Sequence, residues 1–319
     1  MKIALLHNRK AGDQERTERE LVKSLRRHGY EPTVLPPKRF LRENHAEVPG
    51  EFVVVAGGDG SVKRVACALA GSGRPMAILP IGTANNIAHS MGLTGPPEKI
   101  IAGWATGACV SMDLGIAHGP WGRRYFIEGL GLGLFGRTFA IMNRVDEISP
   151  LVLGTREERL YRDLCVLLAL SHELQPVPLR LKVDRRRARS GRFLLCEVLN
   201  IRRSGPGVEL SHSADLSDGF LDLVLVEDGE RRKLLTLLEH CLAGKIPVPL
   251  LHTRRVRRVQ LSLGDNELRI DDEVVWPPDH PRQNPRKSRQ ISVTVEVAPG
   301  ALQCLLPRSA ATKSQPRRK

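Results

Sequence analysis

Short apolar runs alternate with polar turns along the first 120 residues of the chain. The runs are too apolar to lie half-exposed, which is typical of strands that are buried on both faces of a parallel sheet. A glycine-containing turn and then apolar residues at helical spacing follow several of them. The pattern predicts a parallel sheet covered by helices, with strands over Lys2–Asn8, Pro32–Leu35, Glu51–Ala56 and Met76–Leu79.

The apolar pattern changes in the second part of the chain. Gly131–Asn143 and Thr155–Glu173 have helical spacing. From Val177 onward, β-branched segments separated by short turns dominate, with one helical break at Arg231–Ala243. This pattern predicts a mostly antiparallel β domain.

The length of 319 residues also favours two domains. We expect an α/β domain over residues 1–121 and a β domain over residues 122–307, with the option that the closing strand returns to the first domain. Residues 308–319 are basic and carry almost no bulky apolar side chain, which predicts a disordered tail.

Composition excludes several classes of protein. A helix needs about 20 apolar residues to cross a bilayer, and the sequence contains no such run. The first residues lack the apolar region of a secretory signal, so we expect a cytoplasmic protein. The six cysteines form no CxxC pair and the histidines form no HExxH motif, so a zinc site is not indicated.

The formal net charge of +14 is the unusual feature of the composition. Such a charge attracts nucleic acid, an anionic membrane or phosphorylated molecules, although it can also serve solubility alone. Aromatic residues make up only 4%, which disfavours a specific nucleic-acid site because such sites need stacking platforms. The basic residues gather in Arg180–Arg192, Arg254–Arg258, Arg282–Arg289 and the tail; these clusters are interpreted either as a docking surface for anionic lipid or as solvated loops.

The strongest chemical motif follows the strand Glu51–Ala56. Gly57-Gly58-Asp59-Gly60 leads into a predicted helix, with Ser61 at the expected N-cap position. Glycines let backbone N–H groups approach a phosphate and allow positive φ, and a helix N-terminus favours an anion. A carboxylate among such amides indicates a cation, which makes Asp59 a candidate for a Mg²⁺ site.

Two further turns repeat this arrangement. Leu79–Asn86 reads LPIGTANN, in which a strand ends and small polar side chains precede a helix, and Asn8–Gly12 follows the first strand. The carboxyl ends of parallel strands share one edge of the sheet, where open α/β sheets bind ligands. The three turns therefore predict one binding site.

These motifs resemble the diacylglycerol kinase catalytic family in its bacterial lipid-kinase branch, which is related to sphingosine kinases and NAD kinase. The resemblance continues through Val110–Gly115 (VSMDLG), Ala214–Leu223 (ADLSDGFLDL) and Ile270–Glu273 (IDDE), and covers about residues 2–307. It implies a Rossmann-like N-terminal domain of the NAD kinase and phosphofructokinase type and a C-terminal β-sandwich that carries lipid contacts.

The resemblance also implies the roles of individual residues. ATP and Mg²⁺ would be the cofactors, Asp59 and Asp113 would join a carboxylate–Mg²⁺–water network, and Asp271 or Glu273 would take the proton of a lipid hydroxyl. A metal-binding loop is expected at Asp215, Asp218 and the carbonyl of Phe220. The expected nucleotide contacts are Asn8, Gly57, Gly58, Asp59, Gly60, Ser61, Val62, Lys63, Gly82, Thr83, Asn85, Asn86 and Asp113.

Some positions depart from the family pattern. Lys63-Arg64 replace the usual Asn-Glu, Asn86 replaces an aspartate, and Asp272 replaces the glycine of DGE. Because of these departures, the protein could prefer another nucleotide than the family does, or it could have reduced activity. The first turn, Asn8–Gly12, also lacks the common NPxSG.

Gly131–Gly136 matches GxGxxG, and Glu157 and Glu158 lie at the spacing of a ribose-binding acid. The motif lies outside a clear βαβ unit, so we interpret it as close packing or as part of a lipid-pocket wall.

The sequence thus predicts an ATP-dependent lipid kinase that acts on diacylglycerol or a related lipid and associates peripherally with an anionic membrane surface. An NAD kinase-like enzyme and a catalytically weak nucleotide- or anionic-lipid-binding protein are the alternatives. The acceptor lipid and the oligomeric state are left open, a homodimer being one option.

Overall fold

A computed structural model describes residues 1–9, 11–12, 17–42, 48–148, 155–245, 251–277 and 290–311. The chain divides into two compact units. Unit 1 comprises residues 1–114, 215–219 and 298–319, and unit 2 comprises residues 115–214 and 220–297. The division falls within strands β5 (Ala108–Gly119) and β17 (Ile291–Leu306).

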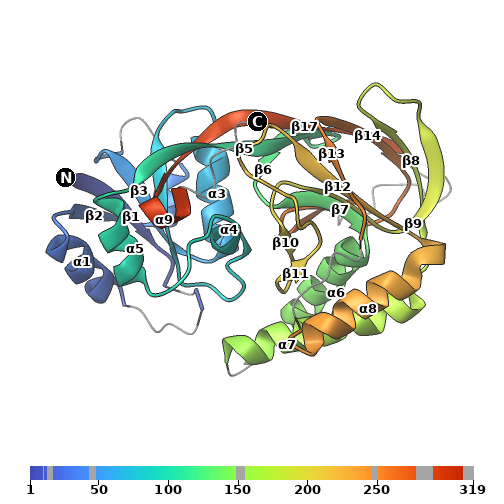
Figure 1. Ribbon diagram of the computed structural model, residues 1–319, viewed down its shortest axis with the longest axis horizontal. Helices are drawn as coiled ribbons and strands as arrows, with labels where there is room; N and C mark the ends of the chain where they lie inside the picture. Colours follow the sequence, from blue (N-terminus) through green and yellow to red (C-terminus); the bar gives the residue numbers. More distant parts are fainter. Residues whose placement is uncertain are drawn as a thin grey trace. The chain divides into compact units, whose positions relative to one another are not determined.

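Unit 1 is built on a parallel sheet (Figure 1). Its order is β2-β1-β3-β4-β17, with β1 (Lys2–His7), β2 (Glu31–Leu35), β3 (Phe52–Gly57), β4 (Pro75–Pro80) and the C-terminal end of β17. The residues of β3 are all buried, which explains why this strand appears in the sequence as an unbroken apolar run. The predicted parallel sheet is confirmed.

The helices of unit 1 are α1 (Glu18–Arg27), α2 (Pro37–Phe40), α3 (Asp59–Leu69), α4 (Asn86–Ser90), α5 (Pro97–Trp104) and α9 (Arg308–Ala311). A capping box of Thr17 and Glu20 starts α1. Helix α1 contacts α5, and α3 contacts α4.

Two expectations for these helices are corrected. Helix α3 begins at Asp59 with Gly58 as its N-cap, so Ser61 is not the N-cap and lies in the first turn. Arg308–Ala311 forms a short helix where the sequence predicts the start of a disordered tail. The rest of that tail and the basic cluster Arg282–Arg289 lie outside the described residues.

Unit 2 is formed mainly by antiparallel strands in the order β16-β15-β7-β9-β8-β14-β17, and β12 pairs with β9 and β13. The strands are β6 (Gly122–Phe126), β7 (Gly129–Gly133), β8 (Val177–Val183), β9 (Arg189–Leu199), β10 (Arg203–Ser204), β11 (Val208–Glu209), β12 (Leu221–Glu227), β13 (Thr253–Val256), β14 (Arg258–Leu263), β15 (Leu268–Ile270) and β16 (Glu273–Trp276). The predicted antiparallel domain is confirmed.

The strands of unit 2 bury side chains on both faces. On β12, Leu221 and Leu223 enter a core formed between strands, whereas Val224 and Val226 enter a second core. The second core also contains side chains of α6 (Leu134–Ile148), α7 (Arg156–Glu173) and α8 (Arg231–Leu242), and the short helix η1 (Asp228–Glu230) precedes α8. None of the described helices is long and apolar enough to cross a bilayer.

The GxGxxG stretch is not a continuous helix. Gly131–Gly133 belongs to β7 and α6 begins only at Leu134, so the helix expected from Gly131 starts three residues late. A Cβ on Gly133 would lie 2.2 Å from the Leu194 carbonyl oxygen, and one on Gly136 would lie 2.4 Å from that of Glu267. These glycines therefore permit close packing, as the sequence analysis favours.

Candidate functional site

Three loops of unit 1 follow the neighbouring strands β1, β3 and β4. The Asn8 N–H donates to the Ala56 carbonyl at 2.9 Å, and the Asn8 side chain donates to the Ser61 hydroxyl at 2.9 Å. The Ile81 N–H donates to the Gly57 carbonyl at 3.2 Å. The expected edge of the sheet thus brings the three strand ends together.

Glycine is required here because the loops touch backbone to backbone. A Cβ on Gly82 would lie 2.2 Å from Cα of Gly58 in the other loop, whereas one on Gly57 would lie 2.7 Å from the side-chain Cβ of Ser61 in its own loop. Glycine is not needed at positions 57, 58 and 82 for a positive φ, because none of these residues has one. Gly12 does have a positive φ. The loops are packed so closely that no side chain separates them.

Asp59 links two of these loops. Its carboxylate accepts the Asn86 N–H at 2.9 Å and the Ile87 N–H at 3.0 Å, at the start of α4. Asn85 adopts φ 53° and bonds through its side chain to both the N–H and the carbonyl of Gly82. Asp59 therefore holds the second loop in place, a role that the sequence analysis missed.

The remaining residues that are predicted to contact the nucleotide differ in burial and in the bonds that their backbone N–H groups make. The Ser61 and Val62 N–H groups donate to the Gly58 carbonyl, and the Val62 side chain is buried. Gly60, Lys63 and Thr83 are partly buried, in the first turns of α3 and in the loop before α4. Asn86 is buried, with its N–H on Asp59.

Asp113 is bound to a different loop of unit 1. Its carboxylate accepts the Gly219 N–H at 2.6 Å and the Gly300 N–H at 2.8 Å, while its own N–H donates to the Leu216 carbonyl. Burial raises the pKa of Asp113, the two N–H donors lower it, and the negative charge of Asp215 raises it further. Asp113 thereby fixes residues 216–219 of the expected metal-binding loop.

The expected metal ligands have the oxygen chemistry of a Mg²⁺ site. Among the described residues, one carboxylate oxygen of Asp215 is bonded, to the N–H and hydroxyl of Ser217. No group of three or more His, Cys, Asp or Glu side chains is placed to hold a metal in the part of the chain that the structure describes. A magnesium ion here would need Asp215, Asp218, a carbonyl and water molecules. Phe220 lies in unit 2, where its ring contacts the guanidinium groups of Arg255 and Arg257.

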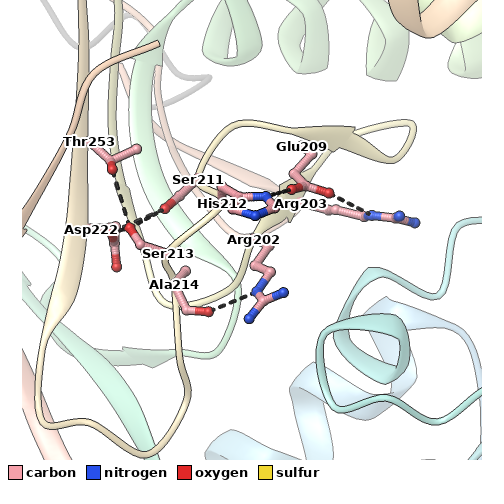
Figure 2. A network of polar contacts seen from close by, with 9 residues as sticks. All are labelled: Arg202, Arg203, Glu209, Ser211, His212, Ser213, Ala214, Asp222 and Thr253. Carbon is pink, nitrogen blue, oxygen red and sulfur yellow. Dashed lines mark hydrogen bonds and ion pairs between the residues drawn. The ribbon is translucent and has the colours of Figure 1, made fainter. Parts of the chain in front are cut away.

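A polar network of unit 2 fixes the segment that leads into this loop (Figure 2). Buried Asp222 accepts from the Ser211 hydroxyl at 3.1 Å and from the Ser213 hydroxyl at 2.7 Å. Arg202 donates to the Ala214 carbonyl at 3.1 Å. Asp222 is not among the predicted site residues, although an acid inside the predicted apolar strand Phe220–Glu227 is a usable signal.

The predicted acids of unit 2 lie where β15 leads into β16, with Asp271 in the two-residue turn and Glu273 as the first residue of β16. Residues 271–273 are called the acidic turn below. Asp271 is 1% exposed, and its carboxylate accepts the N–H groups of Ile127, Glu128 and Gly129 at 3.4, 2.9 and 3.1 Å. Glu273 is exposed and pairs with Arg124 at 2.9 Å. Asp272 does not have positive φ, which explains why glycine is not needed at this position.

A pocket of about 270 Å³ lies elsewhere in unit 2. Leu181, Val183, Leu223 and Leu225 supply its apolar lining, and Arg189, Glu227, Glu230, His252, Thr253 and Arg254 supply its polar lining. An apolar lining beside charged groups suits an amphiphilic ligand.

Comparison with known proteins defines the class. The family described as "Diacylglycerol kinase catalytic domain" matches residues 2–117, and the "YegS C-terminal NAD kinase beta sandwich-like domain" matches residues 155–306. A structure titled as a diacylglycerol kinase from Bacillus anthracis has a TM-score of 0.65 at 14% identity and covers 97% of this chain and 98% of its own. The fold is therefore that of the diacylglycerol kinase type.

Sequence relatives define the family. A "Probable lipid kinase YegS-like" from Cronobacter sakazakii is 31% identical over 95% of this chain and 95% of its own length. A "Diacylglycerol kinase" from Mycobacterium tuberculosis is 27% identical over 81% of this chain and 77% of its own. The chain belongs to the family of YegS-like lipid kinases, which confirms the resemblance found in its motifs.

Proposed function

We propose that this protein transfers the γ-phosphate of ATP to a hydroxyl group of diacylglycerol or a related lipid. The observation that carries the nucleotide half of the proposal is the contact of Gly58 with Gly82, together with the Asp59 carboxylate that joins their loops. Glycines without side chains at this point would let backbone N–H groups approach a phosphate.

Phosphoryl transfer depends on positioning and charge neutralisation more than on covalent chemistry. Mg²⁺, when bound, would neutralise charge on the phosphates, and Asp215 and Asp218 are the proposed ligands together with the Phe220 carbonyl. The Asp215 oxygen that makes no bond to the described residues supports this assignment, as does the effect of the negative charge of Asp215 on Asp113. Asp113 would hold the loop rather than the ion.

Asp271 is the proposed general base for the lipid hydroxyl. Its three N–H donors orient the carboxylate before any substrate arrives, and such preorganisation favours proton transfer. Glu273 is the alternative base, favoured by its exposure. The amphiphilic pocket lined by Leu223 and Leu225 is the proposed place for part of the lipid.

Exposed basic residues support peripheral binding to an anionic membrane. All seven Lys and Arg residues of Arg180–Arg192 are exposed, and β8 pairs with β14, which begins at Arg258. Basic residues near a membrane surface contribute about 1 kcal/mol each. We expect co-sedimentation with phosphatidylglycerol vesicles that weakens as salt rises, whereas vesicles of phosphatidylcholine alone provide the uncharged control.

The deciding experiment offers ATP with diacylglycerol, monoacylglycerol, sphingosine, ceramide and phosphatidylglycerol in mixed micelles, and with NAD as a non-lipid control. A phosphorylated lipid whose formation requires Asp271 supports the proposal and names the acceptor. Phosphorylated NAD would indicate the NAD kinase-like alternative. ATP binding without any product would indicate the weak binding protein that Lys63, Arg64 and Asn86 leave open.

A further inference from the structure

Arg269 carries a charge in the centre of unit 2. Its side chain is 0% exposed and is among the largest of the fully buried side chains. A buried cation is costly unless a carboxylate and further hydrogen bonds compensate it. The contacts of Arg269 therefore indicate why this charge is retained inside a β domain.

The guanidinium group of Arg269 has three polar partners. One nitrogen, Nη2, donates to the Glu197 carboxylate at 2.7 Å and to the Ser204 hydroxyl at 2.5 Å. The other, Nη1, donates to the main-chain carbonyl of Asp271 at 2.5 Å. Glu197 and Ser204 are also 0% exposed. The rings of Phe135 and Phe139 lie 5.6 and 5.4 Å from the guanidinium carbon, within the range of cation–π contacts.

The first glycine of the GxGxxG stretch provides space for this ion pair. Gly131 on β7 is in register with Arg269 on β15 and with Glu197 on β9. A Cβ on Gly131 would lie 2.1 Å from the Glu197 carboxylate. The motif that resembles a dinucleotide site is thus explained in part by a buried charge pair.

The acidic turn is also held by contacts of Asp271 itself. Asp271 has φ 52°, a conformation that costs a non-glycine residue free energy. Its N–H donates to the Gly129 carbonyl at 2.7 Å and its carboxylate holds three N–H groups. Arg269 adds a hydrogen bond to the carbonyl group of Asp271.

We propose that Arg269, held by Glu197 and Ser204, is a positioning residue for the acidic turn 271–273 that offers the general base. This inference rests on the proposed function. Arg269 touches no reacting atom; it fixes the main chain that orients Asp271 and presents Glu273. Removing the partners of Arg269 should therefore lower kcat more than it changes the KM for ATP or the KM for the lipid.

The test compares four variants of the full chain in the mixed-micelle assay. Ser204→Ala removes one partner without changing any charge, and Glu197→Gln keeps the shape of the carboxylate while removing its charge. Arg269→Lys keeps the cation but cannot reach Glu197 and the Asp271 carbonyl at once. Ser171→Ala is the matched control, because Ser171 is similarly buried, in α7, and its hydroxyl donates to the Leu168 carbonyl.

Hydrogen exchange provides a second readout that does not need activity. The Glu128 and Gly129 amides bond to the Asp271 carboxylate, so their exchange reports the position of the turn. We expect Ser204→Ala to speed their exchange and to lower kcat about 10-fold, with both KM values within about twofold of wild type, since only positioning is lost.

Two results would overturn the inference. If Ser204→Ala and Glu197→Gln match Ser171→Ala in amide exchange, Arg269 does not hold the turn. If exchange quickens but kcat stays at the wild-type value, the turn is held without any consequence for catalysis. A wild-type protein that phosphorylates no lipid would contradict the proposed function instead, and the exchange rates would still decide whether Arg269 positions Asp271.

Discussion

Asp59 in unit 1 and Asp271 in unit 2 make the same kind of hydrogen bonds but differ in burial and in their neighbours. Each carboxylate accepts main-chain N–H groups from a segment distant in sequence, Asp59 from the start of α4 and Asp271 from residues 127–129. Asp59 is only partly buried and lies among glycines, whereas Asp271 is 1% exposed and lies beside a buried ion pair.

The difference shows two ways of building a polar site. In the loops of unit 1, the missing side chains of Gly58 and Gly82 bring the backbones together, so adding a methyl group should be the damaging change. In the turn of unit 2, the buried contact of Arg269 with Glu197 sets the geometry, so breaking this contact should be the damaging change.

Asp271→Asn should have the largest effect. The amide keeps the size of the side chain and one acceptor oxygen but cannot take the proton, so we expect kcat to fall about 1,000-fold while ATP binding is retained. Asp184→Asn is the matched control: Asp184 has φ 50° and accepts the N–H groups of Arg257 and Arg258 at 3.0 Å each. Steady-state kinetics in mixed micelles provide the measurement.

Equal losses in the Asp271 and Asp184 variants would show that the carboxylate bonds to main-chain N–H groups, and not proton transfer, are what matters. If instead Glu273→Gln loses activity and Asp271→Asn keeps it, the base is Glu273, and Asp271 only holds the turn.

Gly82→Ala should weaken ATP binding by about 30-fold, because overpacking of this size costs about 2 kcal/mol. The added Cβ would lie 2.2 Å from Gly58, which forces the two loops apart. Gly229→Ala is the control, since a Cβ there meets nothing within 4 Å. Calorimetry with a non-hydrolysable ATP analogue measures the effect, and an unchanged affinity would mean that the loop contact does not shape the nucleotide site.

The sequence predicts the fold well where the pattern is strong. The buried runs around Val53 and Val54 predict the central strands because strands covered on both faces need apolar side chains at every position. The GGDGS and LPIGTANN motifs also predict which loops meet, since parallel strands share one carboxyl edge.

The site is predicted less completely because contacts at long range have no local signal. The pairing of Arg269 with Glu197 joins residues 72 positions apart, and neither lies in a motif. Gly131 was part of a pattern for dinucleotide binding, but its register opposite Glu197 can be seen only in the folded sheet. Ser61 was misplaced because an N-cap and a first-turn serine look alike in sequence.

Asp59→Asn should weaken the binding of Mg²⁺·ATP by about 10-fold, less than Gly82→Ala. Asparagine can accept only one of the two N–H bonds that Asp59 makes with Asn86 and Ile87, and bonds to a charged acceptor are the stronger ones. The same calorimetric titration with and without Mg²⁺ separates the two roles of Asp59. A loss that is equal in both titrations would assign Asp59 to the loop alone and not to a cation.

The smallest effect concerns stability and pH. Burial raises the pKa of Glu197 to about 7, although the charge of Arg269 and its hydrogen bond lower it. Because the ordinary pKa is 4.5, the folded state holds a proton between these two values that the unfolded state has released. The stabilising contribution of protonated Glu197 to the free energy of unfolding is therefore fully present below pH 4.5. It is lost as the pH rises through about 7.

Urea unfolding from pH 5.5 to pH 6.5 should show a fall of about 1 kcal/mol in the free energy of unfolding that disappears in Glu197→Gln. Glu227→Gln is the control, because Glu227 pairs with Arg189 and both side chains are half-exposed. A slope that survives in Glu197→Gln would assign the pH dependence to another group. A slope of opposite sign in the wild type would mean that Arg269 outweighs burial and keeps Glu197 ionised, which would make the unit 2 site a fully charged pair.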